Sequence, residues 1–129
     1  MRKETDFLVL GSGIAGLTFA LKAAEKGKVM IMTKARADES NTKYAQGGIA
    51  GVMHAPDTFE KHIRDTLIAG AGLCREDVVR MVVTEGAERI REIIEWGTRF
   101  DRNAQGDYDL AREGGHSEHR VLHFKDATG

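Results

Sequence analysis

The sequence lacks a second cysteine, an excess of charge of either sign, and any long hydrophobic run. Cys74 is the single cysteine among 129 residues, which excludes an intrachain disulfide and favours a reducing compartment, so we expect a cytoplasmic protein. The formal net charge of -1 and the scattered lysines and arginines do not favour nucleic acid or acidic lipid as a partner. The first apolar run, Phe7–Leu10, is too short for a signal-peptide core or a membrane span. We therefore expect neither nucleic acid nor a membrane as partner.

Two short apolar runs near the N-terminus flank a helical pattern. Residues Phe7–Leu10 and Val29–Met32 are typical of strands buried on both faces of a parallel sheet. Between them, residues 14–26 carry apolar side chains at helical spacing, and Gly27 is the predicted C-cap. Strand, helix and strand within about thirty residues predict a βαβ unit with a right-handed crossover.

Residues 33–56 show no convincing periodicity. Polar residues and glycines dominate this stretch, with a run of small residues at 47–51. A loop of this length inside a compact domain is usually functional, so we expect it to carry part of a site.

Two helices are predicted further along the chain. The first begins near Asp57, where Asp57 and Glu60 match the start of a capping box, and it ends at Gly70. The second covers residues 76–96, and Gly86 within it costs about 1 kcal/mol against alanine, which indicates close packing or a break. A small β-hairpin and a last apolar run are predicted at residues 99–110 and 121–124. The predicted fold class is α/β, with the βαβ unit followed by helices and the hairpin.

The segment between the first strand and the first helix fits the pattern G-x-G-x-x-G. Gly11 permits the tight turn, Gly13 lets the backbone approach phosphates, and Gly16 lets helix and strand pack closely. The helix then directs free N–H groups and the positive end of its dipole at a pyrophosphate. The predicted dinucleotide site consists of Gly11, Ser12, Gly13, Ile14, Ala15 and Gly16, which we call the pyrophosphate loop.

The glycine pattern does not decide which dinucleotide is bound. A nicotinamide fingerprint has an acidic residue at the end of the second strand, where it bonds the ribose hydroxyls. Thr33 and Lys34 occupy that place, and the first acidic residue after them is Asp38. This departs from the usual fingerprint of NAD proteins and of most FAD proteins, so both cofactors stay open on this ground.

Four segments resemble a known family. They are residues 41–50, 65–72, 112–117 and 126–129, and their order and spacing resemble the fumarate reductase and succinate dehydrogenase flavoprotein superfamily. Within it, the wording Tyr-Ala-Gln-Gly-Gly-Ile-Ala is most similar to the L-aspartate oxidase family. The resemblance covers the whole chain but only the first part of such an enzyme. We therefore expect residues 1–129 to be the N-terminal part of a Rossmann-type FAD-binding domain, cut before the later family segments.

The resemblance implies an activity as well as a fold. An enzyme of this kind oxidises L-aspartate to iminoaspartate, with oxygen or fumarate as acceptor, in the first step of de novo NAD biosynthesis, and quinolinate synthase is the implied partner. Relatives in membrane complexes bond their flavin covalently through a histidine, and Asn41 stands in that place here, so noncovalent FAD is implied. The alternatives are a soluble fumarate reductase, which Asn41 and Glu113 argue against, and a non-catalytic dinucleotide-binding module, which would not explain residues 112–116.

The resemblance also implies roles for individual residues. Lys34 replaces the usual acid at the end of the second strand. Glu113 is implied to recognise the amino group of aspartate through charge-assisted hydrogen bonds, with His116 lining the active site beside it. The implied contacts on the flavin side are Asn41, Thr42, Lys43, Tyr44, Ala45, Gln46, Gly47 and Gly48, which we call the flavin loop.

Three histidines close to one another in the sequence raise the question of a metal. His116, His119 and His123 do not fit one helix, and no cysteine accompanies them, so we predict no metal site. The proton-transferring arginine of the family is implied to lie beyond Gly129. We therefore expect the 129-residue chain alone to have no turnover and to retain FAD weakly.

Overall fold

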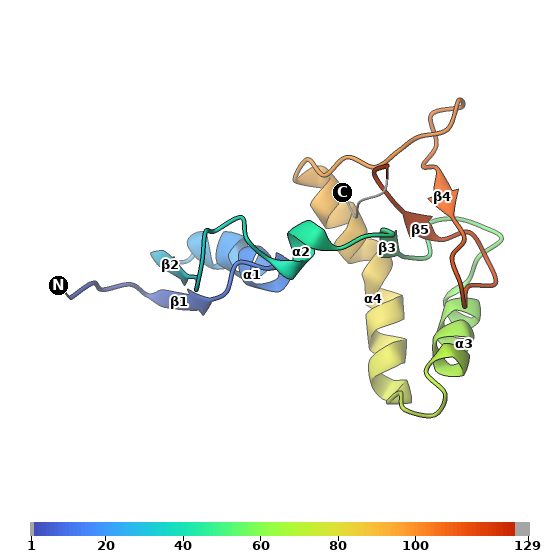
Figure 1. The fold of residues 1–129 in the computed structure, drawn as a ribbon, viewed down its shortest axis with the longest axis horizontal. Coiled ribbons are helices and arrows are strands. Elements are labelled where there is room, and N and C mark those ends of the chain that lie inside the picture. The colour runs from blue at the N-terminus through green and yellow to red at the C-terminus, as the bar shows by residue number, and fades with distance from the viewer. Residues whose placement is uncertain (1, 126–129) are drawn as a thin grey trace. The chain divides into compact units, whose positions relative to one another are not determined.

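The chain forms two compact units in the computed structural model, which describes residues 2–125 (Figure 1). The first unit is Met1–Ala45 and the second is Gln46–Gly129. The motif at residues 126–129 lies outside the described residues.

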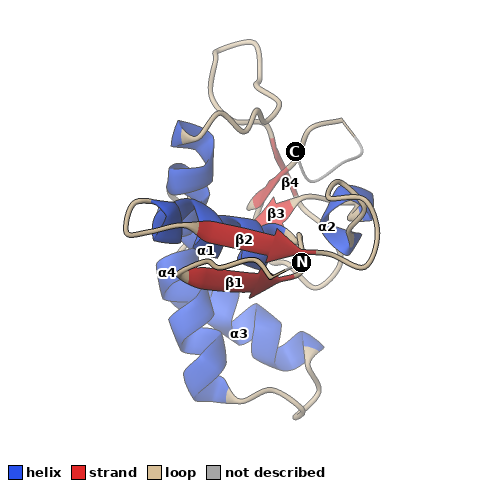
Figure 2. Ribbon diagram, turned by 90° about the vertical axis from the view of Figure 1, so that its left-hand side faces the viewer, coloured by secondary structure: helices blue, strands red, loops and turns tan. Residues whose placement is uncertain are grey.

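The first unit contains the predicted βαβ arrangement. Strands β1 (Phe7–Leu10) and β2 (Val29–Met32) pair in parallel, side by side in Figure 2, and helix α1 (Ile14–Ala24) packs on both. Val9 of β1 is buried, and the Phe7 ring meets the Phe19 ring edge-on at 6.3 Å between centroids. The unit ends with the short helix α2 (Asn41–Tyr44). The predicted strands are thus confirmed at the predicted residues.

Helix α1 ends earlier than its pattern predicts. Its last residue is Ala24 and its C-cap is Glu25, so the prediction of Gly27 as the cap is wrong. Gly27 is needed for another reason, because a Cβ built there would lie 2.7 Å from a carboxylate oxygen of Asp6. The same oxygen accepts a hydrogen bond from the Lys28 N–H at 2.7 Å. A small residue at position 27 therefore lets Asp6 fix the start of β2.

The second unit combines two helices with a small sheet. Helices α3 (Phe59–Ala69) and α4 (Glu76–Glu95) pack against each other. Strands β3 (Ile49–Ala50), β4 (Leu110–Ala111) and β5 (Val121–Leu122) form an antiparallel sheet in the order β3-β5-β4. The core cluster of buried residues contains Ile90, Phe100 and Leu122.

The start of α3 differs from the prediction. Thr58 is the N-cap, and its hydroxyl accepts a hydrogen bond from the Lys61 N–H at 3.2 Å. The prediction of Asp57 as the cap is wrong because its carboxylate bonds Arg120 instead. Glu60 does not close a capping box either, since it pairs with Arg80 of α4 at 2.7 Å.

Several other elements correct or refine the sequence reading. Helix α4 continues unbroken through Gly86, where an added Cβ would meet nothing within 4 Å, so neither close packing nor a break occurs there. The predicted hairpin forms around residues 103–106, with one bridge between Arg102 and Tyr108 and with the Asn103 N–H donating to the Asp107 carbonyl at 2.9 Å. Its last residue, Leu110, pairs with β5. None of the helices in the described part of the chain has the length and apolar character needed to cross a bilayer.

Candidate functional site

The pyrophosphate loop forms a tight turn at the carboxyl end of β1. Gly11 has a φ of +104°, which favours glycine, and its N–H donates to the Met32 carbonyl at 2.8 Å. A Cβ on Gly16 would lie 2.5 Å from the Gly11 carbonyl oxygen, so only glycine lets α1 approach this closely. Two of the three roles predicted for the glycines are therefore visible in the backbone.

The N-terminus of α1 presents backbone donors. Gly13 is the N-cap and carries no capping side chain. The N–H groups of Gly13 and Ala15 donate to no acceptor within the described residues, whereas the Ile14 N–H donates to the Thr42 hydroxyl at 3.1 Å. Unpaired N–H groups at the positive end of a helix dipole fit an anionic phosphate.

Helix α2 brings part of the flavin loop to the pyrophosphate loop. Thr42 makes the contact with Ile14, and a Cβ on Gly13 would lie 3.6 Å from the Thr42 hydroxyl oxygen. The Lys43 ammonium pairs with Asp38 at 3.0 Å, and this bond lowers the pKa of Asp38 and raises that of Lys43. The Asn41 side chain makes no hydrogen bond within the part of the chain that the structure describes, which leaves its amide group available.

Lys34 lies at the same edge of the parallel sheet as the pyrophosphate loop. In the register of the sheet, Leu10 is opposite Met32, so the segments that follow β1 and β2 leave the sheet together. Lys34 is exposed, two residues beyond the end of β2. Ligands of open α/β sheets bind outside the carboxyl ends of the strands, which is where Lys34 is found.

The second unit places Glu113 against the glycines of the flavin loop. Gly47 and Gly48 have φ values of +91° and +115°. A Cβ on Gly48 would lie 2.1 Å from the Leu122 carbonyl oxygen, and one on Gly47 would lie 3.0 Å from Oε1 of Glu113. The Glu113 side chain is exposed and makes no ion pair or hydrogen bond among residues 2–125. Its carboxylate is therefore close to Gly47 and free to accept.

A cavity of about 480 Å³ surrounds this contact. It is lined by residues of the flavin loop, by Ala111 of β4, by Glu113 and by two residues that follow β5. The lining residues are Gln46, Gly47, Ala111, Glu113, His123 and Lys125.

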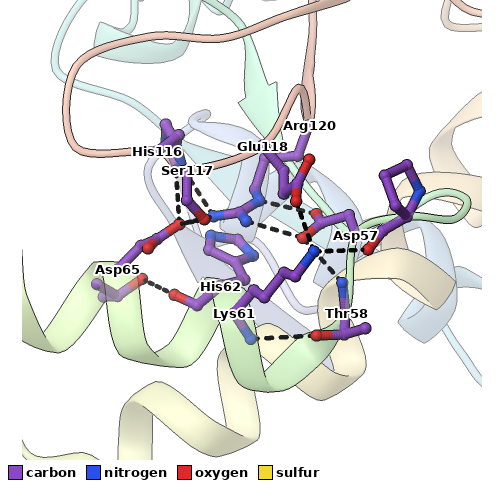
Figure 3. Close-up of polar contacts among 11 residues, drawn as sticks. Asp57, Thr58, Lys61, His62, Asp65, His116, Ser117, Glu118 and Arg120 are labelled. Carbon is purple, nitrogen blue, oxygen red and sulfur yellow. Dashed lines mark hydrogen bonds and ion pairs between the residues drawn. The ribbon is translucent and has the colours of Figure 1, made fainter.

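The second unit also contains a buried cluster of charges (Figure 3). Arg120 is fully buried and forms two hydrogen bonds of 2.8 Å with the two oxygens of Asp57. Its Nη1 also donates to Oδ2 of Asp65 at 2.7 Å. We call Asp57, Asp65 and Arg120 the charge cluster.

Hydrogen bonding controls the ionisation of the cluster. Burial raises the pKa of Asp65, but hydrogen bonds from Ser117 and Arg120 outweigh it and lower that pKa to about 2. Burial lowers the pKa of Arg120, and its bonds to Asp57 and Asp65 raise it by more. Burial, followed by the charge of Arg120, also lowers the pKa of the neighbouring His62.

His116 contacts the charge cluster. Its Nδ1 lies 3.2 Å from Nη1 of Arg120, and because a guanidinium only donates, Nδ1 is the acceptor. His119 contacts the Leu110 carbonyl, and His123 lies 3.3 Å from Asp101. Within residues 2–125, no group of three His, Cys, Asp or Glu side chains could hold a metal ion.

Comparison with known proteins decides between the two dinucleotides. The model of the family described as FAD binding domain matches residues 6–129. The chain belongs to the FAD binding domain family. The α/β Rossmann-type fold is thereby confirmed, and so is FAD as the cofactor that the sequence predicts.

Among curated relatives, L-aspartate oxidases match the chain throughout. L-aspartate oxidase 2-a, chloroplastic, from Nicotiana tabacum is 55% identical over 96% of this chain and 19% of its own length. L-aspartate oxidase from Streptomyces coelicolor is 48% identical over 96% of this chain and 22% of its own length. This FAD binding domain chain thus spans about a fifth of the relatives it matches.

Solved structures show the same fold. Mycobacterium smegmatis Sdh1 in complex with UQ1 has a TM-score of 0.90 at 30% identity, over 98% of this chain and 22% of that one. Quinol-fumarate reductase with menaquinol molecules also has a TM-score of 0.90, at 32% identity, over 99% of this chain and 23% of that one. The resemblance to the fumarate reductase and succinate dehydrogenase superfamily is therefore confirmed.

The sequence reading gave no role to the charge cluster. Asp65 lies in one of the four family segments, but no local pattern predicts its partner or singles out Arg120. The capping role predicted for Asp57 is wrong. In the sequence, Arg120 is separated from Asp65 by 55 positions and from Asp57 by 63 positions. Local sequence patterns do not show contacts over such separations.

Proposed function

We propose that this chain is the N-terminal part of an FAD-dependent L-aspartate oxidase. The enzyme would convert L-aspartate to iminoaspartate, reducing oxygen to hydrogen peroxide or fumarate to succinate. The observation that carries the proposal is the unpaired Glu113 carboxylate next to Gly47 of the flavin loop. The names of the curated relatives support the same activity.

The residues of the first unit fit the cofactor. The free N–H groups of Gly13 and Ala15 would bind the pyrophosphate, with Ser12 and Ile14 beside them. Lys34 would lie at the ribose side. Bound FAD would supply the two-electron oxidant that the oxidation of aspartate needs. Asn41 has no nucleophilic ring nitrogen, so the cofactor would be held without a covalent bond at this position.

Glu113 would select the substrate. Its carboxylate can accept charge-assisted hydrogen bonds from the ammonium group of aspartate. Succinate has no such group, and therefore gains nothing from Glu113. This difference favours aspartate oxidation over the second candidate function, which is that of a soluble fumarate reductase. The second candidate is considered because a solved quinol-fumarate reductase has the same fold.

The test is Glu113→Gln in the full-length protein that carries these residues. We expect kcat/KM for L-aspartate to fall about 10- to 100-fold, because a hydrogen bond between charged groups is lost. Reduction of fumarate by a chemically reduced enzyme should change less than twofold, because fumarate has no amino group. Glu60→Gln, which removes an exposed carboxylate on α3, is the matched control.

Two results would contradict the proposal. Unchanged aspartate oxidation in Glu113→Gln would remove the role given to Glu113. A wild-type protein that oxidises succinate faster than aspartate would favour the fumarate reductase candidate instead.

The proposal includes a cellular setting. Iminoaspartate is the expected substrate of quinolinate synthase, which we propose as the partner that consumes the product. The single cysteine supports a reducing compartment such as the cytoplasm.

A further inference from the structure

In the charge cluster, Arg120 is paired with two carboxylates, although one would balance its charge. Asp57 binds the guanidinium through both of its oxygens at 2.8 Å, which already pairs the charge. Asp65 adds a second buried carboxylate beside the same cation. Burying a further charge carries a desolvation cost. The contacts of Asp65 other than Arg120 therefore need an explanation.

Those contacts are to the segment that carries Glu113, residues 112–117, which we call the substrate loop. Oδ2 of Asp65 accepts the Ser117 N–H at 2.8 Å and the Ser117 hydroxyl at 2.7 Å, in addition to Arg120 (Figure 3). Asp57 makes no bond to the substrate loop. Asp65 is thus the member of the cluster that connects α3 to this loop.

The substrate loop is held at both ends. At its base the Arg120 N–H donates to the Ala111 carbonyl at 3.1 Å, and at its far end Ser117 binds Asp65. Between these points the His116 N–H donates to the Glu113 carbonyl at 3.2 Å, in a turn where Gly115 has a φ of +85°. The main chain of Glu113 is therefore one turn away from the residue that Asp65 fixes.

We propose that Asp65 is a positioning residue for substrate recognition, which acts through Ser117 to hold the Glu113 carboxylate against Gly47. This inference rests on the function proposed above. Asp65 touches neither substrate nor cofactor in this scheme. It sets the place of the carboxylate that binds the amino group, and a small displacement of such a group lowers binding strongly.

The test uses Ser117→Ala and Asp65→Asn in the full-length FAD-loaded protein. Both variants should raise KM for L-aspartate about tenfold while kcat stays within about twofold, since the reacting atoms are untouched. KM for fumarate should not change, because fumarate has no amino group for Glu113. Ser117→Thr keeps a hydroxyl and should restore most of the wild-type KM. Glu60→Gln, a carboxylate-to-amide change on the same helix, is the control.

A double-mutant cycle shows whether the effect passes through Glu113. In a Glu113→Gln background, Ser117→Ala should raise KM for aspartate less than twofold further, because its target is already lost. A full tenfold effect in that background would overturn the proposal, and so would equal losses for aspartate and fumarate. Should Asp65→Asn fail to fold, Ser117→Ala and Ser117→Thr decide alone.

The two proposals fail in different ways. If Glu113→Gln raises KM for aspartate but Ser117→Ala does not, only the positioning role is wrong. If Glu113→Gln leaves that KM unchanged, the substrate role of Glu113 is wrong, and the positioning role is overturned with it.

Discussion

The ionisation of one residue, Asp65, affects the stability of the second unit. Its pKa of about 2 lies below the usual value of 3.8 for an aspartate, so the folded state favours the ionised form. A lowered pKa adds stability that is complete above the unfolded value and disappears as pH falls through the folded value. We expect Asp65 to contribute about 2 kcal/mol near neutral pH, lost between about pH 4 and pH 2.

Urea unfolding of wild type and Asp65→Asn across this range measures the effect. The difference in unfolding free energy between the two proteins should shrink by about 2 kcal/mol as pH falls from 5 to 2. Glu60→Gln should show no such trend, because Glu60 is exposed. A constant difference between wild type and Asp65→Asn at every pH would contradict the ionisation described here.

At the scale of elements, two neighbouring residues at the start of α3 have different roles, one as the helix cap and the other as an ion-pair partner. Thr58 caps the helix through one hydrogen bond, while Asp57 next to it pairs with a fully buried arginine. Thr58→Ala should therefore cost about 1 kcal/mol. Asp57→Ala should cost about 3–5 kcal/mol, because it removes the two-oxygen partner of a buried cation. Thermal or urea unfolding of both variants measures the difference, and a larger loss for Thr58→Ala would reverse our assignment.

The elements also show what the sequence could predict. Strands β1 and β2 and helix α4 were predicted within one residue, because each has a sustained apolar pattern. Strand β5 lies within the apolar run predicted at residues 121–124. The two-residue strands β3 and β4 were not predicted, since their pairing partners are distant in sequence. The charge cluster was not predicted for the same reason. The glycine pattern and the family segments do predict the pyrophosphate loop and Glu113 as site residues. Whether those residues bind as proposed stays a prediction.

At the scale of the whole molecule, large apolar side chains remain exposed in both units. Leu10 of β1 is 73% exposed and Met32 of β2 is 55% exposed, although parallel strands are normally covered on both faces. On α4, Val82 is 59% exposed. Exposed apolar surface of this kind usually marks a contact with further protein. This chain spans about a fifth of the length of its relatives. The remaining residues of such a protein could cover these apolar side chains.

The 129-residue chain, produced alone, should therefore behave differently from the full-length protein. We expect it to bind a hydrophobic dye such as ANS, to retain FAD in far less than equimolar amount after gel filtration, and to produce no aspartate-dependent peroxide. The physical reason is that the N–H groups of the pyrophosphate loop provide only part of the contacts that a dinucleotide needs, while uncovered strands lose packing energy. A flavin absorbance spectrum, the dye fluorescence and a peroxide assay measure the three outcomes against the full-length protein. An equimolar flavin spectrum with robust turnover would show that residues 1–129 complete the site by themselves, and would contradict the proposal that they are only its N-terminal part.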